Sequence, residues 1–186
     1  MIFNKHFNLV GTHAFLSASN PHWVNDDDEK FDRRYDNAVA AKRGTDLHAL
    51  AHDLIRMGVR LPDIPETMNL YVNDAIDYGM TPEQPLFYSP NCYGTPDAIG
   101  FGQNLLRIHD LKTGATRTKV LQLLVYSAIF CLEYMIKPFD IETELRIYQS
   151  DEVRVYPADP DEITHIMDRI VVRDERIEAR RAEMEA

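Results

Sequence analysis

The sequence holds two short apolar runs that a glycine-rich turn joins, and this stretch constrains the fold more than any other. The runs cover residues 92–99 and 105–112, and residues 100–102 form the turn between them. Short apolar runs joined in this way predict two antiparallel strands. Side chains repeat every two residues along a strand, so Asp110 and Lys112 are expected on one face. The pattern therefore predicts a carboxylate beside a lysine at the end of a strand.

The spacing of apolar residues predicts the remaining elements. Spacings of three and four predict helices over residues 35–57, 66–78 and 118–135, and a further helix from residue 159 onward. Alternating polar and apolar residues predict a strand over 83–88 and a hairpin over 141–156. The strand over 83–88 would complete a three-stranded antiparallel meander with the two runs. This order predicts an α/β fold whose mixed central sheet, made of the meander and the C-terminal hairpin, is flanked by helices.

The length of the chain predicts a single domain over residues 1–186. The helix over 159–186 is expected to be partly solvated. After Arg173 its sequence is polar on all sides, with no packing reason to be rigid. Gly44 lies inside the first predicted helix, where a glycine costs about 1 kcal/mol relative to alanine. The usual reason for such a glycine is the close approach of another backbone or of a ligand.

Composition excludes several classes of protein. No apolar run reaches the roughly 18 residues of a membrane span, and the N-terminus has no signal-peptide pattern. Cys92 and Cys131 are the only cysteines, too few for a disulfide framework or an iron–sulfur cluster. We therefore expect a cytoplasmic protein with free thiols and no membrane partner. The net charge of -10 argues against a protein that coats nucleic acid, but a nuclease needs only a local basic patch.

The two strands over 92–99 and 105–112 carry the groups that phosphodiester hydrolysis requires. One or two Mg or Mn ions can activate the water, neutralise the transition state and assist the leaving oxygen. Such ions prefer carboxylate and carbonyl oxygens, so Asp97 and Asp110 are expected ligands, with the backbone carbonyl of Leu111 as a third. Lys112 would face the same water or phosphate as an electrostatic stabiliser or proton-transfer partner. Asp97, Asp110 and Lys112 are therefore the predicted catalytic residues.

These residues resemble the signature of a known superfamily. Pro96–Asp97 followed by Asp110–Leu111–Lys112 is similar to the motif of the PD-(D/E)XK nucleases. Three further segments resemble motifs of the RecB-like exonucleases, in the same order along the chain. They are residues 44–48 (G-x-x-x-H), 94–97 (G-x-x-D) and 122–126 (Q-x-x-x-Y).

The resemblance implies roles for residues outside the two strands. It implies that His48 is a metal ligand, which would complete a mixed His/Asp/Asp site for Mn or Mg. Gln122 and Tyr126 lie four residues apart on one helix face and would contact the substrate backbone or orient Lys112. Thr113 and Arg117 would contact a phosphate after the lysine. Three further residues, expected to support the site or admit a close approach, are Glu83, Gly44 and His52.

The resemblance also implies a restriction-endonuclease-like core over about 13–156 and a compact phage-type exonuclease of the lambda-exonuclease-like group, without an iron–sulfur cluster. Its substrate would be linear DNA with free ends, in phage or bacterial recombination or repair. A recombination protein and further copies of the chain would be its partners. A structure-specific or nicking endonuclease on the same core is a second interpretation. The third is a DNA-end-binding or protein-interaction module on a nuclease scaffold, which the net charge of -10 favours.

Overall fold

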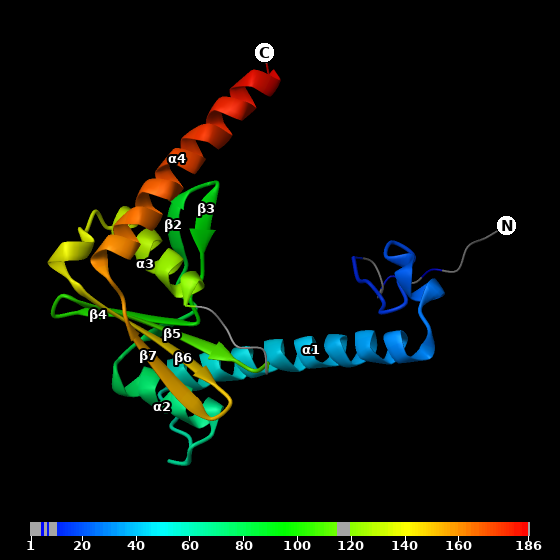
Figure 1. Ribbon diagram of the computed structural model, residues 1–186. Helices are drawn as coiled ribbons and strands as arrows, with labels where there is room; N and C mark the ends of the chain where they lie inside the picture. The colour runs from blue at the N-terminus through cyan, green and yellow to red at the C-terminus, as the bar shows by residue number, and fades with distance from the viewer. Residues whose placement is uncertain (1–4, 6, 8–10, 115–119, 186) are drawn as a thin grey trace. The chain divides into compact units, whose positions relative to one another are not determined.

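The computed structural model of the protein describes residues 5, 7, 11–114 and 120–185. Helices make up much of this described part (Figure 1). The α-helices are α1 (Asp28–Met57), α2 (Thr67–Asp77), α3 (Leu121–Glu133) and α4 (Pro160–Glu185), and the 3-10 helices are η2 (Pro21–Asn25) and η3 (Pro138–Asp140). The chain divides within α1 into two compact units, residues 1–43 and 44–186. The single domain expected from the sequence therefore stays a prediction.

A mixed five-stranded sheet forms the centre of the larger unit. Its strands, in spatial order, are β1 (Thr81–Pro82), β4 (Ala98–Gly102), β5 (Leu105–Lys112), β6 (Glu142–Gln149) and β7 (Glu152–Pro157). β5 and β6 run parallel, and the other neighbouring strands run antiparallel. Parallel neighbours need a crossover connection, and α3 lies in the segment that joins β5 to β6. The predicted α/β class and mixed sheet are confirmed.

The predicted three-stranded meander is wrong. β2 (Leu86–Ser89) and β3 (Cys92–Gly94) form a separate two-stranded sheet, and the short strand β1 takes the place beside β4. The strand predicted over 92–99 thus breaks at residues 95–97. Pro96 is the physical reason, because a proline has no backbone N–H to give to a ladder of hydrogen bonds. The strand predicted over 83–88 breaks as well, since Glu83 lies in a turn with φ +48°.

Helices lie on both faces of the central sheet (Figure 1). Side chains of the sheet pack against these helices in two core clusters. On one face, Leu106 and Ile108 of β5 pack in a core cluster with residues of α3 and α4. On the other face, Leu111 and Tyr148 pack with residues of α2 and of the C-terminal part of α1. Full burial of one such side chain contributes about 1.5–3 kcal/mol. The two faces alternate along β5, so Asp110 and Lys112 share the face that α3 covers.

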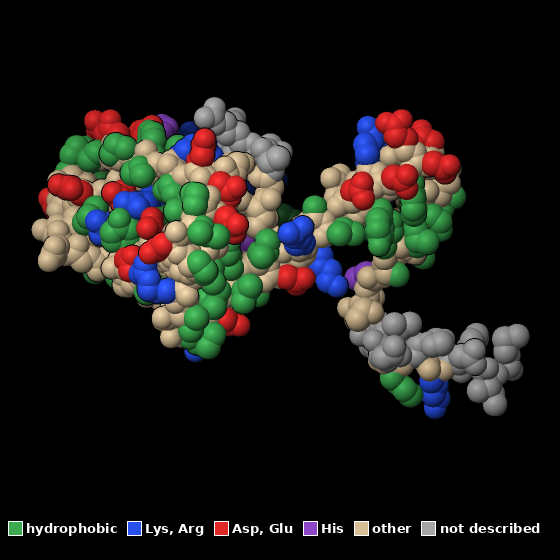
Figure 2. Space-filling model, turned by 90° about the horizontal axis from the view of Figure 1, so that it is seen from below, with side chains coloured by type: hydrophobic (Ala, Val, Ile, Leu, Met, Phe, Trp, Pro, Cys, Tyr) green, Lys and Arg blue, Asp and Glu red, His purple; other side chains and the backbone are tan. Residues whose placement is uncertain are grey.

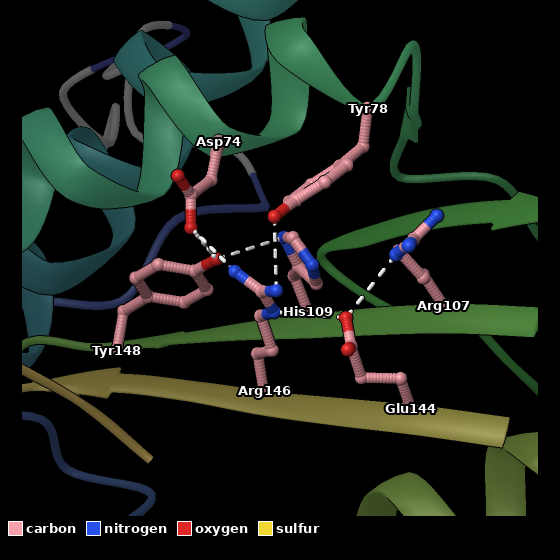
Figure 3. A network of polar contacts seen from close by, with 7 residues as sticks. All are labelled: Asp74, Tyr78, Arg107, His109, Glu144, Arg146 and Tyr148. Carbon is pink, nitrogen blue, oxygen red and sulfur yellow. Dashed lines mark hydrogen bonds and ion pairs between the residues drawn. The ribbon is translucent and has the colours of Figure 1, made fainter. Parts of the chain in front are cut away.

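A buried polar network joins α2 to the sheet (Figure 3). The hydroxyl of Tyr148 donates to Asp74 Oδ2 at 2.7 Å and lies 3.2 Å from His109 Nδ1. Since the hydroxyl has one proton, His109 Nδ1–H is the donor of the second bond. Burial lowers the pKa of His109 to about 3, and the charges of Arg146 and Arg107 lower it further. His109 is therefore neutral and has a structural role, on the face of the sheet opposite Asp110.

The expectation that the chain after Arg173 lacks a reason to be rigid is wrong. α4 continues to Glu185, and its polar side chains hold the tip of the β2–β3 hairpin. Asp174 Oδ1 accepts from Ser89 Oγ at 2.5 Å, and Glu178 Oε1 accepts from the Asn91 amide at 2.6 Å. The spacing of apolar residues reveals only apolar packing, so it cannot reveal contacts with a hairpin more than 80 residues earlier.

The smaller unit, Met1–Arg43, contains η2 and the first part of α1. In this unit Phe15 packs edge-on against Phe31, with ring centroids 5.7 Å apart. α1 begins seven residues before the predicted start at residue 35. Asp27 caps this start, because its Oδ1 accepts from the backbone N–H of Lys30 at 2.8 Å. Among the described residues of the whole chain, no helix is both long and apolar enough to cross a membrane.

Candidate functional site

The end of β5 carries a buried carboxylate next to a lysine. Lys112 Nζ donates to Asp110 Oδ1 at 2.8 Å, as expected for neighbours on one strand face. Asp110 is only 2% exposed. Its second oxygen, Oδ2, is buried and has no hydrogen-bond partner among the described residues. An unpaired carboxylate oxygen in this position costs free energy unless a cation or a donor reaches it.

Asp97 lies in the break between β3 and β4, beside the same strand end. Its Oδ2 accepts the backbone N–H of Leu111 at 2.7 Å, and its Oδ1 lies 3.4 Å from His48 Nδ1. β4 begins at Ala98, opposite His109, and an extension of this register past the end of β4 would place Pro96 opposite Leu111. Because Pro96 has no N–H, the carbonyl of Leu111 has no ladder donor on this side. Leu111 thus presents its carbonyl toward the side on which Asp97 lies.

His48 reaches the strand end from α1. Its side chain is 28% exposed and therefore accessible from solvent. The hydrogen bond to Asp97 raises the pKa of His48, while burial opposes this increase. The charges of Lys112 and Asp110 also act on the imidazole, which places all four groups within electrostatic reach of one another. Metal ligation would require the neutral imidazole, so a bound cation and a proton compete for His48.

Burial dominates the electrostatics of Asp110. It raises the pKa of this carboxyl to about 6, the hydrogen bond from Lys112 opposes the increase, and the charge of Asp97 adds to it. A divalent cation would favour the ionised form of both carboxylates and relieve their mutual repulsion. The oxygen and imidazole donors here suit Mg or Mn. The chemistry of the donor set and the unpartnered Oδ2 of Asp110 therefore fit such an ion.

These donors are not grouped around a single ion position in the structure. Within the part of the chain that the structure describes, no three His, Cys, Asp or Glu side chains are already grouped to hold a metal ion. His48 pairs with Asp97, whereas Asp110 pairs with Lys112. For all three to bind one ion, the side chain of Asp110 or of His48 would have to turn toward the other pair.

α3 brings the second motif to the same face of the sheet. Gln122 Nε2 donates to Tyr126 Oη at 3.1 Å, so the two residues share one side of the helix. A Cβ placed on Gly94 would lie 2.8 Å from the ring carbon Cε1 of Tyr126. The glycine three residues before Asp97 is therefore in close contact with the α3 tyrosine, and the two motifs are neighbours in space.

Gly44 has a similar role on α1. A Cβ placed there would lie 2.8 Å from Thr113 Oγ1, the residue directly after Lys112. The chain after β5 thus approaches the helix that carries His48 as closely as a glycine allows. Thr113 itself is exposed.

Glu83 and His52 form no side-chain hydrogen bond with His48, Asp97, Asp110 or Lys112 among the described residues. Glu83 is exposed in the turn after β1, although its backbone N–H donates to the backbone carbonyl of Asp97 at 3.0 Å. His52 Nδ1 lies 3.2 Å from the carboxylate of its neighbour Asp53. Arg117 lies outside the described residues.

Sequence reasoning missed two buried residues at the site. Gln149 stands opposite Lys112 in the β5–β6 register, is 7% exposed, and donates to the Gly114 carbonyl at 2.5 Å. It therefore holds the chain just after the lysine. Tyr71 of α2 is 2% exposed, and its pKa is raised by burial and then by the charges of Asp97 and Asp110. The inward face of the second predicted helix could have indicated Tyr71, whereas no local signal indicates Gln149.

No protein family and no curated protein matches the chain. The resemblance to the PD-(D/E)XK nucleases therefore stays an expectation from the sequence motifs.

Proposed function

We propose that the chain is a metal-dependent DNA nuclease of the PD-(D/E)XK type that acts as an exonuclease on linear DNA. One observation supports this proposal most strongly. The buried Asp110 has an oxygen without a partner, lies 2.8 Å from Lys112, and interacts electrostatically with Asp97 and His48. A chain that needed only a stable fold would gain from an apolar residue at this position, because a buried ion pair contributes little to stability.

The residues of the cluster would divide the work of hydrolysis. Asp97, Asp110, His48 and the carbonyl of Leu111 would hold one or two Mg or Mn ions. When bound, these ions supply charge neutralisation and lower the pKa of a bound water. Lys112 would stabilise negative charge that develops on the phosphate, or transfer a proton at the attacking water. Gln122 and Tyr126 of α3 would contact the DNA backbone, as would Thr113 and Arg117.

The topology supports a restriction-endonuclease-like core, which we include in the proposal. The antiparallel pair β4–β5 and the parallel pair β5–β6, with α3 in the connection, give a mixed sheet with the cluster at the end of its central strand. In folds with parallel strands, ligand sites commonly form at the carboxyl ends of those strands. The cluster lies at the carboxyl end of β5.

Digestion of end-labelled linear DNA with Mg or Mn tests the proposal. We expect Asp110→Asn and Lys112→Met each to lower the rate at least about 100-fold, because each removes a charge from the reacting centre. Asp168→Asn and Lys137→Met are matched controls on exposed positions, and both should retain activity. Full activity in Asp110→Asn or Lys112→Met would refute the assignment.

Covalently closed circular DNA separates an exonuclease from an endonuclease on the same core. An exonuclease leaves the circle intact, whereas a nicking or structure-specific endonuclease converts it to open or linear forms. Labels at the 5′ and 3′ ends of single- and double-stranded substrates then give the polarity. We place this activity in recombination or repair within a phage-infected or bacterial cytoplasm, with a recombination protein or further copies of the chain as partners.

A DNA-end-binding module without catalysis is the second candidate. The open donor arrangement favours it, since no group of three ligands is preassembled among the described residues. Calorimetric titration with Mn distinguishes the two candidates. Binding of Mn that Asp110→Asn abolishes supports the nuclease, whereas DNA binding without Mn binding supports the module.

A further inference from the structure

We infer that α4 carries a binding surface for the phosphodiester backbone of DNA, separate from the cluster at the end of β5. Four arginines recur along α4 at intervals of four, three and four residues. They are Arg169, Arg173, Arg176 and Arg180. These intervals place all four on one stripe of the helix, which we call the arginine stripe. This inference rests on the proposed function, because both take DNA as the ligand.

One side of α4 already has partners. It packs on the core through Ile163 and Ile166. Further along the helix, Asp174, Glu178 and Arg181 continue this side and bind the tip of the β2–β3 hairpin. The arginine stripe lies beside this side, and all four of its residues are exposed. In the described part of the chain, no arginine of the stripe belongs to the core cluster or binds the hairpin.

The arginines of the stripe are largely unpaired, although the chain has 30 acidic residues. Arg180 pairs with Glu183 at 2.6 Å. Arg169, Arg173 and Arg176 form no ion pair with any residue that the structure describes. Like charges at these spacings destabilise a helix, and the stripe contains three such pairs. Folding alone therefore does not require the stripe.

The stripe borders a groove that leads toward α3. This groove has a volume of about 290 Å³, and Arg169 and Arg173 line it together with Val125. Val125 lies less than one turn along α3 from Gln122, a predicted contact of the DNA backbone. A DNA strand that extends from the cluster past Gln122 would therefore meet the positive charges of Arg169 and Arg173.

Charge and spacing identify the ligand as a polyanion with regularly spaced charges. From Arg169 to Arg180 the helix rises about 16 Å, which corresponds to about five phosphates of one B-form strand. The face of residues 44–186 in view in Figure 2 mixes acidic, basic and hydrophobic side chains. In a chain with a net charge of -10, a local row of cations is the kind of feature that could attract DNA.

Fluorescence anisotropy with labelled 20-nucleotide single strands and duplexes, in EDTA and at 50 to 200 mM salt, tests the inference. The triple variant Arg169→Gln, Arg173→Gln, Arg176→Gln should make the slope of log K against log salt shallower by about 2–3. The single variant Arg173→Gln should change it by about 1. The triple variant Arg33→Gln, Arg56→Gln, Lys137→Gln removes the same charge elsewhere and should leave the slope within about 0.5 of wild type.

An unchanged slope in both stripe variants, or an equal change in the control, would overturn the inference. So would a wild type that ignores DNA but binds polyglutamate through the stripe, which would indicate an acidic protein partner. Circular dichroism and thermal midpoints check that each variant folds, and the single variant keeps the test valid if the triple one does not. EDTA prevents cleavage, so this assay measures DNA binding alone. The salt dependence of binding can therefore fail to change in the stripe variants whether or not the chain is a nuclease.

Discussion

The contact between Gly94 and Tyr126 makes a sharp prediction for Gly94→Ala. The φ angle of Gly94 is not in the left-handed region, so the backbone itself accepts an alanine. The added Cβ, however, would lie 2.8 Å from Cε1 of the tyrosine ring, with Cδ1 at 3.6 Å and Cζ at 3.9 Å. At 2.8 Å two carbons overlap, so either the ring or the β2–β3 hairpin must move.

The expected loss of stability follows from two opposing terms. Overpacking of this kind costs about 1–3 kcal/mol. Alanine also restricts the unfolded chain, which returns about 0.4–1 kcal/mol. We therefore expect Gly94→Ala to lower the free energy of unfolding by about 1–2 kcal/mol, or the melting temperature by about 2–8 °C for a chain of this size.

Urea denaturation of four proteins measures this effect: wild type, Gly94→Ala, Tyr126→Ala and the double variant. In the Tyr126→Ala background the ring is gone, so Gly94→Ala should be close to neutral and the coupling should be about 1–2 kcal/mol. Gly102→Ala is the matched control, because a Cβ there meets nothing within 4 Å and its φ is also ordinary. It should leave stability unchanged or slightly higher. The reasoning fails if Gly94→Ala matches Gly102→Ala, or if removal of the ring gives no rescue.

Two further predictions concern the charge of Asp110 and the anchoring of α4. The pKa of Asp110 in the folded chain, about 6, lies above the unfolded value of about 3.9. The contribution of this carboxyl to the free energy of unfolding is therefore full below pH 4 and is lost as pH rises through 6. Metal-free wild type should therefore lose roughly 2–3 kcal/mol relative to Asp110→Asn between pH 4 and pH 7 in urea denaturation, and an equal difference at both pH values would contradict this. Asn91→Ala removes hydrogen bonds to Asp174, Glu178 and Arg181, so amides of α4 after Arg173 should exchange with deuterium at least about 5-fold faster, whereas Gln84→Ala should leave them unchanged.

Elements with a strong local pattern could be predicted from the sequence. β5 has the bounds that alternation predicts, residues 105–112, and α2 lies within its predicted range. The shared face of Asp110 and Lys112 follows from strand periodicity alone, and their hydrogen bond confirms it. Gln122 and Tyr126 follow in the same way from helix periodicity. In each case the information lies within a few residues of the chain.

Features that depend on distant partners could not be predicted. β4 pairs with β1 rather than with β2. This pairing depends on which backbone N–H and C=O groups are available, and the spacing of apolar residues does not indicate that. The hydrogen bond between Gln149 and Gly114 joins residues 35 positions apart in the sequence. The hydrogen bonds between α4 and the hairpin join residues more than 80 positions apart. Such polar contacts leave no periodic trace, because one suitable side chain at each end is sufficient.

The break that makes the meander prediction wrong also builds the candidate site. In a regular antiparallel ladder, residues 96 and 111 would exchange both of their hydrogen bonds, since their register extends the pairs Ala98–His109 and Gly100–Arg107. Pro96 prevents this exchange, and the Asp97 carboxylate takes the N–H of Leu111 instead. One carboxylate oxygen is thereby fixed at the strand end, and the other lies toward His48. The proline of the motif thus has a physical reason that catalysis alone does not supply: without it the ladder would continue, and Asp97 would lose the contact that holds it in place.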